Sequence, residues 1–190
     1  MEADIARLTD ENKNLSADKV ALTADKEKLT QDLTTTTTVK QELEKKVDIA
    51  STLNASNITV TPINIKKNGK EDVSSKAKKV DKLVISFDVD NRIAQPGSST
   101  DIYVLVMGPD GKLLAPTGTE VATFTTREEG DKGYTAKMPV NLEAAKKKNV
   151  EFGFTPGTNF QIGSYKVQIY QNGFLIGEGT TLLKKGGIFG

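Results

Sequence analysis

A seven-residue spacing of leucines is the feature that most constrains how this chain can fold. The first 61 residues contain neither glycine nor proline, and within them Leu8, Leu15, Leu22, Leu29 and Leu43 are separated by multiples of seven. Such a repeat places its side chains along one side of an α-helix. A single helix would leave this row in water, so the sequence predicts a helix that associates with another surface.

A second row of the same period completes the expected seam. If the leucines are heptad position d, position a carries apolar, asparagine and lysine side chains. The predicted oligomer seam comprises Ile5, Leu8, Asn12, Leu15, Lys19, Leu22, Lys26, Leu29, Leu33, Leu43 and Val47. Leucine at d with a buried asparagine at a favours a parallel homodimer, with a trimer as the alternative, and the lysines at a make the association weak.

Acidic residues precede most of the a positions. Position g carries Asp4, Glu11, Asp18, Asp25 and Asp32. These carboxylates either neutralise the a-position lysines of a partner helix or form an acidic face in solvent. The run Thr34–Thr38 is the expected weak point, since β-branched residues lose rotamer freedom in a helix, and we expect loose helix there.

The composition changes near residue 54, where a second domain is expected to begin. All eleven aromatic residues, seven Phe and four Tyr, lie at or after Phe87. From Asn57 the apolar pattern has period two, and turn residues separate short segments, which predicts antiparallel strands. The expected strands span 57–65, 82–88, 102–107, 120–125, 135–141, 150–154, 164–170 and 174–183. Eight short strands without long helices favour a β-sandwich, and the fold class is α plus all-β.

Local signals within this half predict one core strand and two turns. Leu83, Ile85, Phe87 and Val89 alternate with other residues, so they should face the core. Pro109-Asp110-Gly111 suits a type I turn, and Asn172-Gly173 suits the type I′ turn of a two-residue hairpin. That hairpin would place Val167 opposite Glu178 on a buried face, so we expect a bulge at Gly177 or Gly179 to correct the register.

The segment 163–177 contains Gly-x-Tyr-x-Val-x-Ile followed by the Asn172-Gly173 turn. It resembles the last hairpin of immunoglobulin-like domains, as in fibronectin-type and bacterial sandwiches. The sequence lacks the Cys and Trp residues of antibody domains. The whole arrangement resembles uncharacterised bacterial envelope proteins with a coiled-coil stalk before such a domain. The resemblance implies a stalk helix at 1–54, an immunoglobulin-like β-sandwich at 55–190 and a periplasmic or other extracytoplasmic location, and it carries over no functional residue.

Composition excludes several kinds of chemistry. Cysteine and histidine are absent, which removes thiol nucleophiles, disulfides and the usual base at neutral pH. The formal net charge of +1 gives no global attraction to nucleic acid or membranes. The chain shows neither a run of 18 apolar residues nor a signal peptide, although removal of an anchor or signal stays open. We expect no enzyme activity, no nucleic-acid partner, and membrane contact only through an anchor absent from this sequence.

Four oxygen-bearing side chains form the best candidate metal cluster. Asp88, Asp90 and Asn91 end one predicted strand, and Asp101 follows the next loop. Carboxylate and amide oxygens are ligands for Ca²⁺, so we predict a calcium site here, against the alternative of carboxylates in solvent. No other cofactor is expected.

The predicted loop between the first two strands is rich in lysine. It carries Lys66, Lys67, Lys70, Lys76, Lys78, Lys79 and Lys82. Such a loop is either simply solvated or contacts anionic lipids or glycans. It has no arginine and no aromatic residue for reading or stacking on bases. The leading hypothesis is a non-enzymatic structural or interaction protein of the bacterial cell envelope. In it, the stalk associates with a second copy of itself and presents a β-sandwich head to an unknown envelope partner. The alternative is a ligand-binding module that uses the Asp88/Asp90 cluster or this basic segment.

Overall fold

The computed structural model describes residues 1–90, 99–116, 118, 120–142 and 146–186. The chain divides into two compact units, Met1–Ile49 and Ala50–Gly190. The first is a single α-helix, α1 (Glu2–Ala50), and the second is built from antiparallel strands. The predicted domain boundary lay after residue 54, whereas α1 ends at Ala50 and the first strand begins at Asn54.

Helix α1 is continuous through the threonine run, so the loose helix expected at Thr34–Thr38 is not observed. Hydroxyls in this run donate hydrogen bonds to carbonyl oxygens one turn earlier, as Thr34 does to Thr30 and Thr38 does to Thr34, at 2.8 and 3.0 Å. These bonds satisfy the hydroxyls within the helix and leave the methyl groups outward. Helix α1 also has no buried residue.

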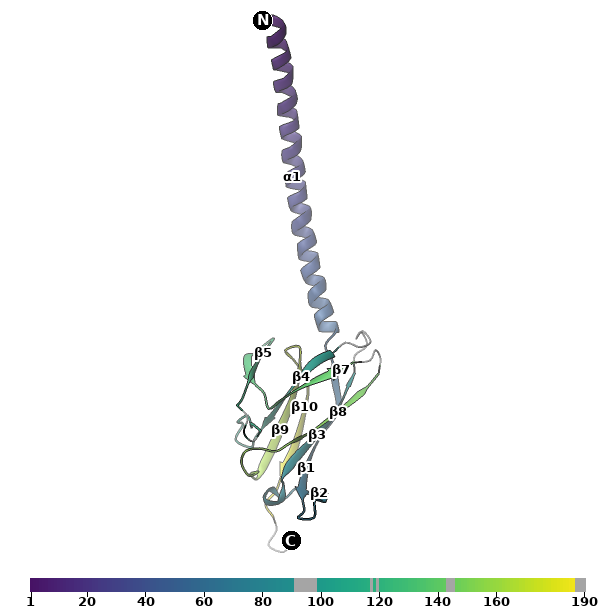
Figure 1. Cartoon of the computed structure of the whole chain (residues 1–190), viewed down its shortest axis with the longest axis vertical. Helices are drawn as coiled ribbons and strands as arrows, with labels where there is room; N and C mark the ends of the chain where they lie inside the picture. The colour runs from purple at the N-terminus through teal and green to yellow at the C-terminus, as the bar shows by residue number, and fades with distance from the viewer. Residues whose placement is uncertain (91–98, 117, 119, 143–145, 187–190) are drawn as a thin grey trace. The chain divides into compact units, whose positions relative to one another are not determined.

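Two four-stranded antiparallel sheets form the second unit (Figure 1). The first sheet has the order β2 (Glu71–Val73), β1 (Asn54–Ile65), β3 (Lys82–Asp90), β8 (Lys148–Phe154). The second has the order β10 (Phe174–Leu183), β9 (Gly163–Gln171), β4 (Ser99–Met107), β7 (Ala136–Asn141). A separate hairpin joins β5 (Thr123–Thr126) to β6 (Gly130–Gly133), and a 3-10 turn, η1, spans Ala77–Lys79.

Each of the eight predicted strands overlaps an observed one, and the structure adds two that the sequence did not reveal. These are β2, which is three residues long and contains two acidic residues, and β6, which begins and ends with glycine. Neither has the apolar alternation that predicts a strand. Both are held by pairing to a neighbour, β2 to the end of β1 and β6 to β5.

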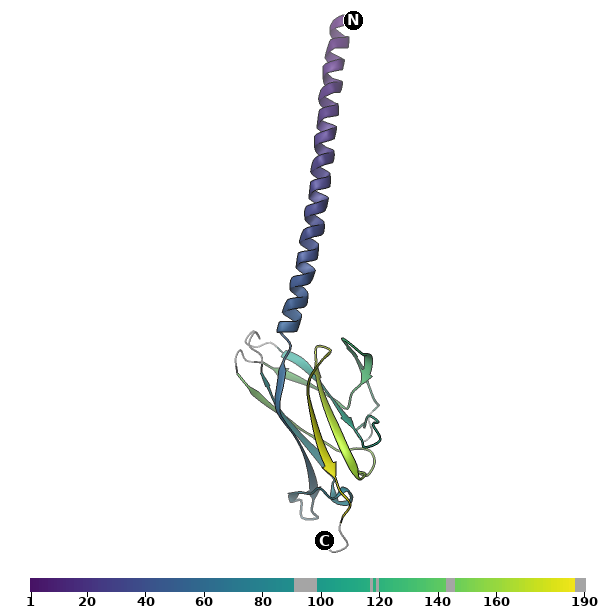
Figure 2. The same ribbon diagram turned by 180° about the vertical axis from the view of Figure 1, so that it is seen from behind.

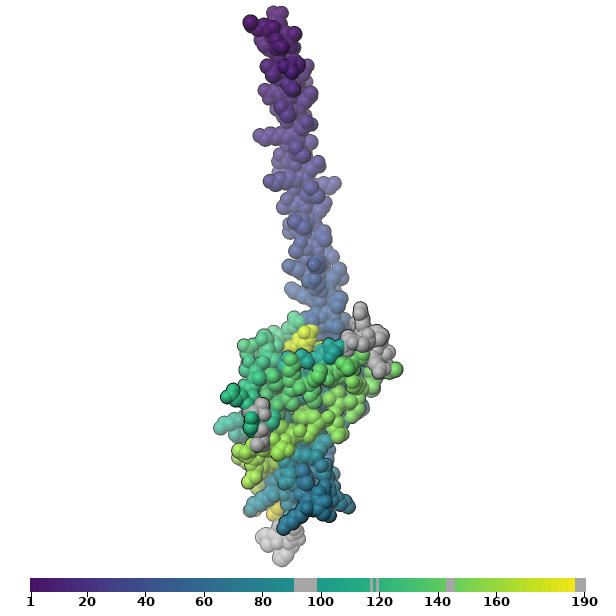
Figure 3. Space-filling view, viewed as in Figure 1, coloured from purple at the N-terminus to yellow at the C-terminus, as the bar shows by residue number. Residues whose placement is uncertain are grey.

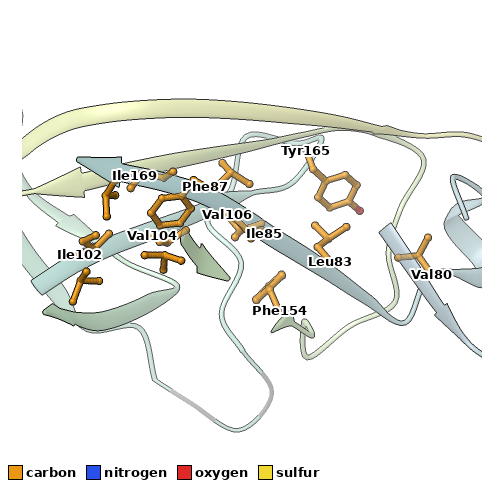
Figure 4. Packing of buried hydrophobic residues seen from close by; sticks show 14 of the residues in the cluster. Val80, Leu83, Ile85, Phe87, Ile102, Val104, Val106, Phe154, Tyr165 and Ile169 are labelled. Carbon is orange, nitrogen blue, oxygen red and sulfur yellow. The ribbon is translucent and has the colours of Figure 1, made fainter. Parts of the chain in front are cut away.

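The main core lies between the two sheets, and β3 supplies its centre, as predicted. Leu83, Ile85, Phe87 and Val89 have no exposed surface, and they pack in one cluster with inward side chains of β4 and β9. Figure 4 shows Phe87 and Ile85 among these residues. Full burial of each such side chain contributes about 1.5–3 kcal/mol, so this face of β3 is a major source of stability.

A second, smaller cluster lies on the opposite face of the second sheet. Tyr103 of β4 stacks on Phe124 of β5 with ring centroids 4.5 Å apart, and Tyr134 and Tyr170 meet these rings edge to face. The β5–β6 hairpin therefore covers an aromatic surface that would otherwise face water. Lys132 of β6 lies over the Tyr170 ring and donates a 3.0 Å hydrogen bond to its hydroxyl.

Both predicted turns are confirmed, and the predicted register correction is present. Gly111 has φ +74° and donates to the carbonyl of Gly108, while Asn172 and Gly173 both have positive φ. The β9–β10 register shifts between Leu175 and Gly177, so that Gly179 faces Val167 and Glu178 faces Gln168. Glu178 thereby reaches Gln168 Nε2 and Lys166 Nζ, each at 2.6 Å, on the solvent side of the sheet.

The two edge strands of the second sheet, β7 and β10, differ in what limits further strand pairing. Strand β7 is an edge strand of the second sheet, and it carries Pro139, which pairs with Asp101 of β4. Strand β10, at the other edge, packs closely on β1 of the opposite sheet at Gly177 and Gly179. A Cβ at Gly179 would lie 2.6 Å from Ile58 Cγ2 and 3.3 Å from Val60 Cγ2. These glycines let the two sheets close at this edge.

The substitution Gly179→Ala should therefore lower the free energy of unfolding by about 1–3 kcal/mol, because the added methyl group overpacks a contact between branched side chains. Urea denaturation of the full chain measures the change. Gly153→Ala in β8 is the matched control, since its added Cβ would meet only Lys82 Cδ at 3.7 Å. Equal effects of the two substitutions would contradict close packing of β10 on β1.

Candidate self-association interface and other candidate sites

The predicted seam of α1 is an uninterrupted exposed row. Its d-position leucines are between 55% and 69% exposed, and Ile5, Leu33 and Val47 at position a are 60–68% exposed. Globular domains rarely leave large aliphatic side chains this open in a regular row. The helix by itself therefore presents an apolar stripe along most of its length.

Shallow hollows lie between the side chains of α1, both along the seam and beside it. A hollow on α1 is lined by Leu15, Asp18, Lys19, Leu22, Thr23 and Lys26. In heptad terms these are d, g, a, d, e and a. In a coiled coil, each a or d side chain of one helix inserts between four such residues of its partner. These positions would form two adjoining sockets if α1 paired in a coiled coil, but the hollow alone does not distinguish the seam, since a similar one lies around Val20 and Ala24.

Threonines widen this apolar stripe on one side. At heptad position e, Thr9, Thr23, Thr30 and Thr37 each donate a hydrogen bond of 2.7–2.8 Å to the carbonyl of the a residue four positions earlier. Because the hydroxyls are satisfied within the helix, their methyl groups are free to contact a partner. The sequence pattern revealed the position of these threonines but not the direction of their hydroxyls.

The structure separates the residues of the predicted calcium site. Asp88 and Asp90 point away from the core on β3, as the burial alternation shows. Asp101 points outward from the other sheet, since its neighbour Ile102 faces the core, and it pairs with Lys137 Nζ at 2.9 Å. Two sheets and their shared core thus lie between Asp101 and the other two carboxylates. Asn91 lies outside the described residues.

Asp88 takes part in a network of amide groups instead. Its Oδ1 accepts a 2.9 Å hydrogen bond from Asn149 Nδ2, and its Oδ2 accepts a 2.8 Å bond from Asn57 Nδ2. Asn57 has φ +52° at an irregularity in the β1–β3 pairing, which turns its amide toward Asp88. The bond from Asn149, with a smaller contribution from Asn57, holds the pKa of Asp88 below its ordinary value. Among the described residues, no group of three acidic, His or Cys side chains is arranged to hold a metal ion.

The lysine-rich segment is folded rather than an open loop. Lys66 and Lys70 pair through their backbones at the turn of the β1–β2 hairpin, and η1 follows. Lys66 and Lys82 form ion pairs with Asp72 and Glu71. The prediction missed that the end of β10 joins this segment: Ala77 N donates to Lys184 O at 3.0 Å, and Lys184 N donates to Ser75 O at 2.7 Å. No local sequence signal indicates that contact.

A cavity of about 290 Å³ lies between the β5–β6 turn and the β9–β10 turn, lined by Glu128, Glu129, Tyr170 and Phe174 among others. Cations of the chain already lie over both rings, Lys132 over Tyr170 at 5.3 Å and Arg127 over Phe174 at 5.2 Å. Lys132 also pairs with Glu129. These contacts stabilise the two turns against each other, as does the bond from Arg127 N to Gly173 O.

The fold thus defines a two-sheet antiparallel domain preceded by a long helix. Residues 56–184 match the family described as "Domain of unknown function (DUF8428)", and the chain belongs to this family. The matched region begins within β1 and ends just after β10, so it does not include α1. No curated protein matches the chain.

Solved structures show only distant similarity. The chain is 16% identical to a β-glucosidase from Kluyveromyces marxianus in complex with glucose, with 70% of this chain and 14% of that chain covered and a TM-score of 0.39. It is 12% identical to a GH3 β-glucosidase from Bifidobacterium adolescentis, with 70% and 17% covered and a TM-score of 0.40. The chain spans less than one fifth of the length of either enzyme. Within the described residues, no helix has the length and apolarity needed to cross a membrane.

The amide network around Asp88 should make stability depend on pH. A carboxyl group whose pKa is lower in the folded state stabilises the fold above its unfolded pKa of about 4, and the contribution is lost as the pH falls through the lowered value. We therefore expect Asp88→Asn to destabilise the protein at pH 7 and to have a smaller effect near pH 2. Thermal melts across this range test it.

Asn149→Ala removes the main donor and serves as the companion variant. It should reproduce the pH dependence of Asp88→Asn. An effect of Asp88→Asn that is the same at both pH values would contradict a role for the charged carboxylate.

Calcium addition tests the remaining metal hypothesis. Because both Asp88 oxygens already accept amide hydrogen bonds, millimolar Ca²⁺ should leave the melting temperature unchanged. A rise in melting temperature that disappears in Asp88→Asn together with Asp90→Asn would instead establish a calcium site at this edge.

Proposed function

We propose that the protein is a non-enzymatic structural or interaction protein of the bacterial cell envelope, in which α1 forms a coiled-coil stalk that joins copies and carries the two-sheet domain. The observation that carries this proposal is the exposed leucine row on a helix with no buried residue. A helix of 49 residues gives a stalk about 73 Å long. Burying the row requires a second copy or another helix.

The polar seam residues favour a parallel homodimer. In a parallel, in-register pair, Asn12 meets Asn12 of the second copy, and the amides hydrogen bond across the seam. Asp18 and Asp25 at position g then lie beside Lys19 and Lys26 of the partner, which offsets the cost of lysine at position a. An antiparallel pair would instead place g residues against g residues, so the acidic side chains near the middle of the helix would repel. A parallel trimer is the alternative.

Strand order supports an immunoglobulin-like assignment for the second unit. In such domains strands A, B and E share one sheet and C, F and G share the other. Here β1, β3 and β8 lie in one sheet and β4, β9 and β10 in the other, with β7 extending the second sheet beside β4. The order of these strands along the chain and in each sheet is the order of A, B, E and of C, F, G.

A tyrosine at the start of the penultimate strand adds to this support. Tyr165 is buried in β9, and its hydroxyl accepts a 2.7 Å hydrogen bond from Gln161 N and donates a 3.1 Å bond to Gln161 O. A tyrosine whose hydroxyl bonds to the backbone a few residues upstream is the tyrosine corner of immunoglobulin-like domains. Burial raises the pKa of Tyr165 and outweighs the hydrogen bond from the Gln161 backbone, which lowers it, so the hydroxyl stays protonated and can donate.

The non-enzymatic and envelope parts of the proposal have separate supports. Several carboxylates of the described two-sheet unit are engaged structurally, Asp88 by amides and Asp101 and Glu178 by lysines. The sequence has no histidine or cysteine. The envelope location rests on the resemblance to bacterial proteins with a stalk before such a domain, and the envelope partner is a separate molecule of unknown identity.

The substitution Leu22→Lys should shift the protein toward monomer, because it places a charge in the middle of the seam. Light scattering after size-exclusion chromatography of the full chain measures the mass. The protein without substitutions should have twice the chain mass of 20.5 kDa if it is a dimer, or three times that mass if it is a trimer. Leu22→Lys should approach the mass of one chain at the same concentration.

Val20→Lys is a matched control for this experiment. Val20 is 70% exposed and Leu22 is 69% exposed, so the two changes differ mainly in the face of α1 that they alter. Val20→Lys should leave the mass unchanged. A monomeric unchanged protein at the highest soluble concentration would overturn the stalk proposal.

A further inference from the structure

The basic surface of the second unit is larger than the sequence indicates. Strand β1 begins at Asn54 and reaches the β1–β2 hairpin at Ile65, and η1 and the end of β10 meet beside this hairpin. Figures 1 and 2 show the hairpin and the end of β10 at the same end of the unit, seen from opposite sides. A bridge between Lys76 and Lys184 joins the two segments. We call the resulting surface the lysine end.

Positive charge is concentrated at the lysine end. Its nine lysines are Lys66, Lys67, Lys70, Lys76, Lys78, Lys79, Lys82, Lys184 and Lys185, and its three carboxylates are Glu71, Asp72 and Asp81. The whole chain has a formal net charge of only +1, so the remainder of the chain is net negative. The overall net charge does not reveal this separation, because the positive and negative parts nearly cancel.

All three carboxylates of the lysine end are already engaged. Asp72 pairs with Lys66, Glu71 pairs with Lys82 Nζ at 2.6 Å, and Asp81 accepts a 2.6 Å bond from Ile65 N. The other seven lysines have no ion-pair partner among the described residues. Six of them, all except Lys76, are exposed. Placing these charges together raises the energy of the folded protein unless an external anion offsets the repulsion.

Apolar side chains accompany the lysines at the hairpin. Val73 is 72% exposed and Ile65 is 45% exposed. Val73 pairs with Ile63, and Ile65 lies two residues further along β1, so Val73 and Ile65 point to the same face. The segment 60–80, in blue, forms the surface at this end (Figure 3). Exposed aliphatic side chains beside lysines suit a lipid surface, which offers both phosphates and hydrocarbon.

We propose that the lysine end binds the surface of an anionic phospholipid membrane, with the lysines attracting lipid phosphates and with Ile65 and Val73 entering the headgroup region. This contact is made by the folded domain itself and needs no membrane anchor. Nucleic acid is a poorer match, since the lysine end has no aromatic side chain for stacking and no arginine. A soluble polyanion would use the lysines alone.

Sedimentation of the full chain with vesicles tests the proposal. The protein should bind vesicles containing about one third phosphatidylglycerol and bind neutral phosphatidylcholine vesicles much more weakly. Raising the salt from about 0.1 M to about 1 M shortens the screening length from about 10 Å to about 3 Å and should weaken binding strongly. Equal binding to both kinds of vesicle would overturn the proposal.

Charge-matched variants separate the lysine end from net charge. Changing Lys78, Lys79 and Lys185 together to Gln should weaken binding to anionic vesicles by about 100-fold. The control changes Lys13, Lys28 and Lys45 to Gln, which lowers the net charge equally at positions of α1 outside the seam. Equal losses in the two variants would show that the lysine end is not the binding surface.

The apolar contact distinguishes a lipid surface from a soluble polyanion. Ile65→Thr together with Val73→Thr keeps the β-branched shape but adds hydroxyls, and it should weaken vesicle binding while leaving the salt dependence unchanged. An unchanged affinity would overturn the lipid assignment in favour of a soluble polyanion such as inorganic polyphosphate. Thermal melts confirm that each variant remains folded.

Discussion

Packing of the inward face of β3 against the second sheet is the interaction on which the rest of the domain depends. Leu83, Ile85, Phe87 and Val89 are fully enclosed, and they fix which side of β3 faces solvent. That choice in turn sets the outward direction of Asp88 and the register that brings Asn57 and Asn149 to it. A shift by one residue would bury the carboxylate and expose Phe87, so the core and the amide network are specified together.

Short-range patterns predicted much of the fold. The heptad row of α1, the alternation of β3 and the Asn172-Gly173 turn are all periodicities or turn signals within a few residues, and each corresponds to an observed element. The β5–β6 hairpin was only half predicted because its stability comes from contacts with distant partners. Phe124 packs on Tyr103 and Tyr170, which belong to other strands, and β6 itself has no apolar pattern.

The candidate sites, too, could be predicted only as far as they depend on residues close together in the sequence. The apolar row on α1 depends only on residues within one helix, so the sequence could place it, and its use as an oligomer seam stays a prediction. Asp101 lies apart from Asp88 and Asp90 because proximity along the chain says nothing about which sheet a strand joins, and β3 and β4 belong to different sheets. For the lysine-rich segment, the sequence grouped too few residues rather than too many. The sequence located its first part but not Lys184 and Lys185, which join it through a backbone contact formed across more than one hundred residues.

The proline in β7 has a consequence for copies that are held close together. An edge strand with free amide groups can pair with the same strand of a neighbouring molecule and continue the sheet from one copy to the next. Pro139 has no amide hydrogen to contribute, so a ladder along β7 is interrupted near its middle. Tethering on a common stalk would raise the local concentration of these domains greatly. If the proposed stalk holds copies together, Pro139 would disfavour continuation of the sheet from β7 of one copy to β7 of the next.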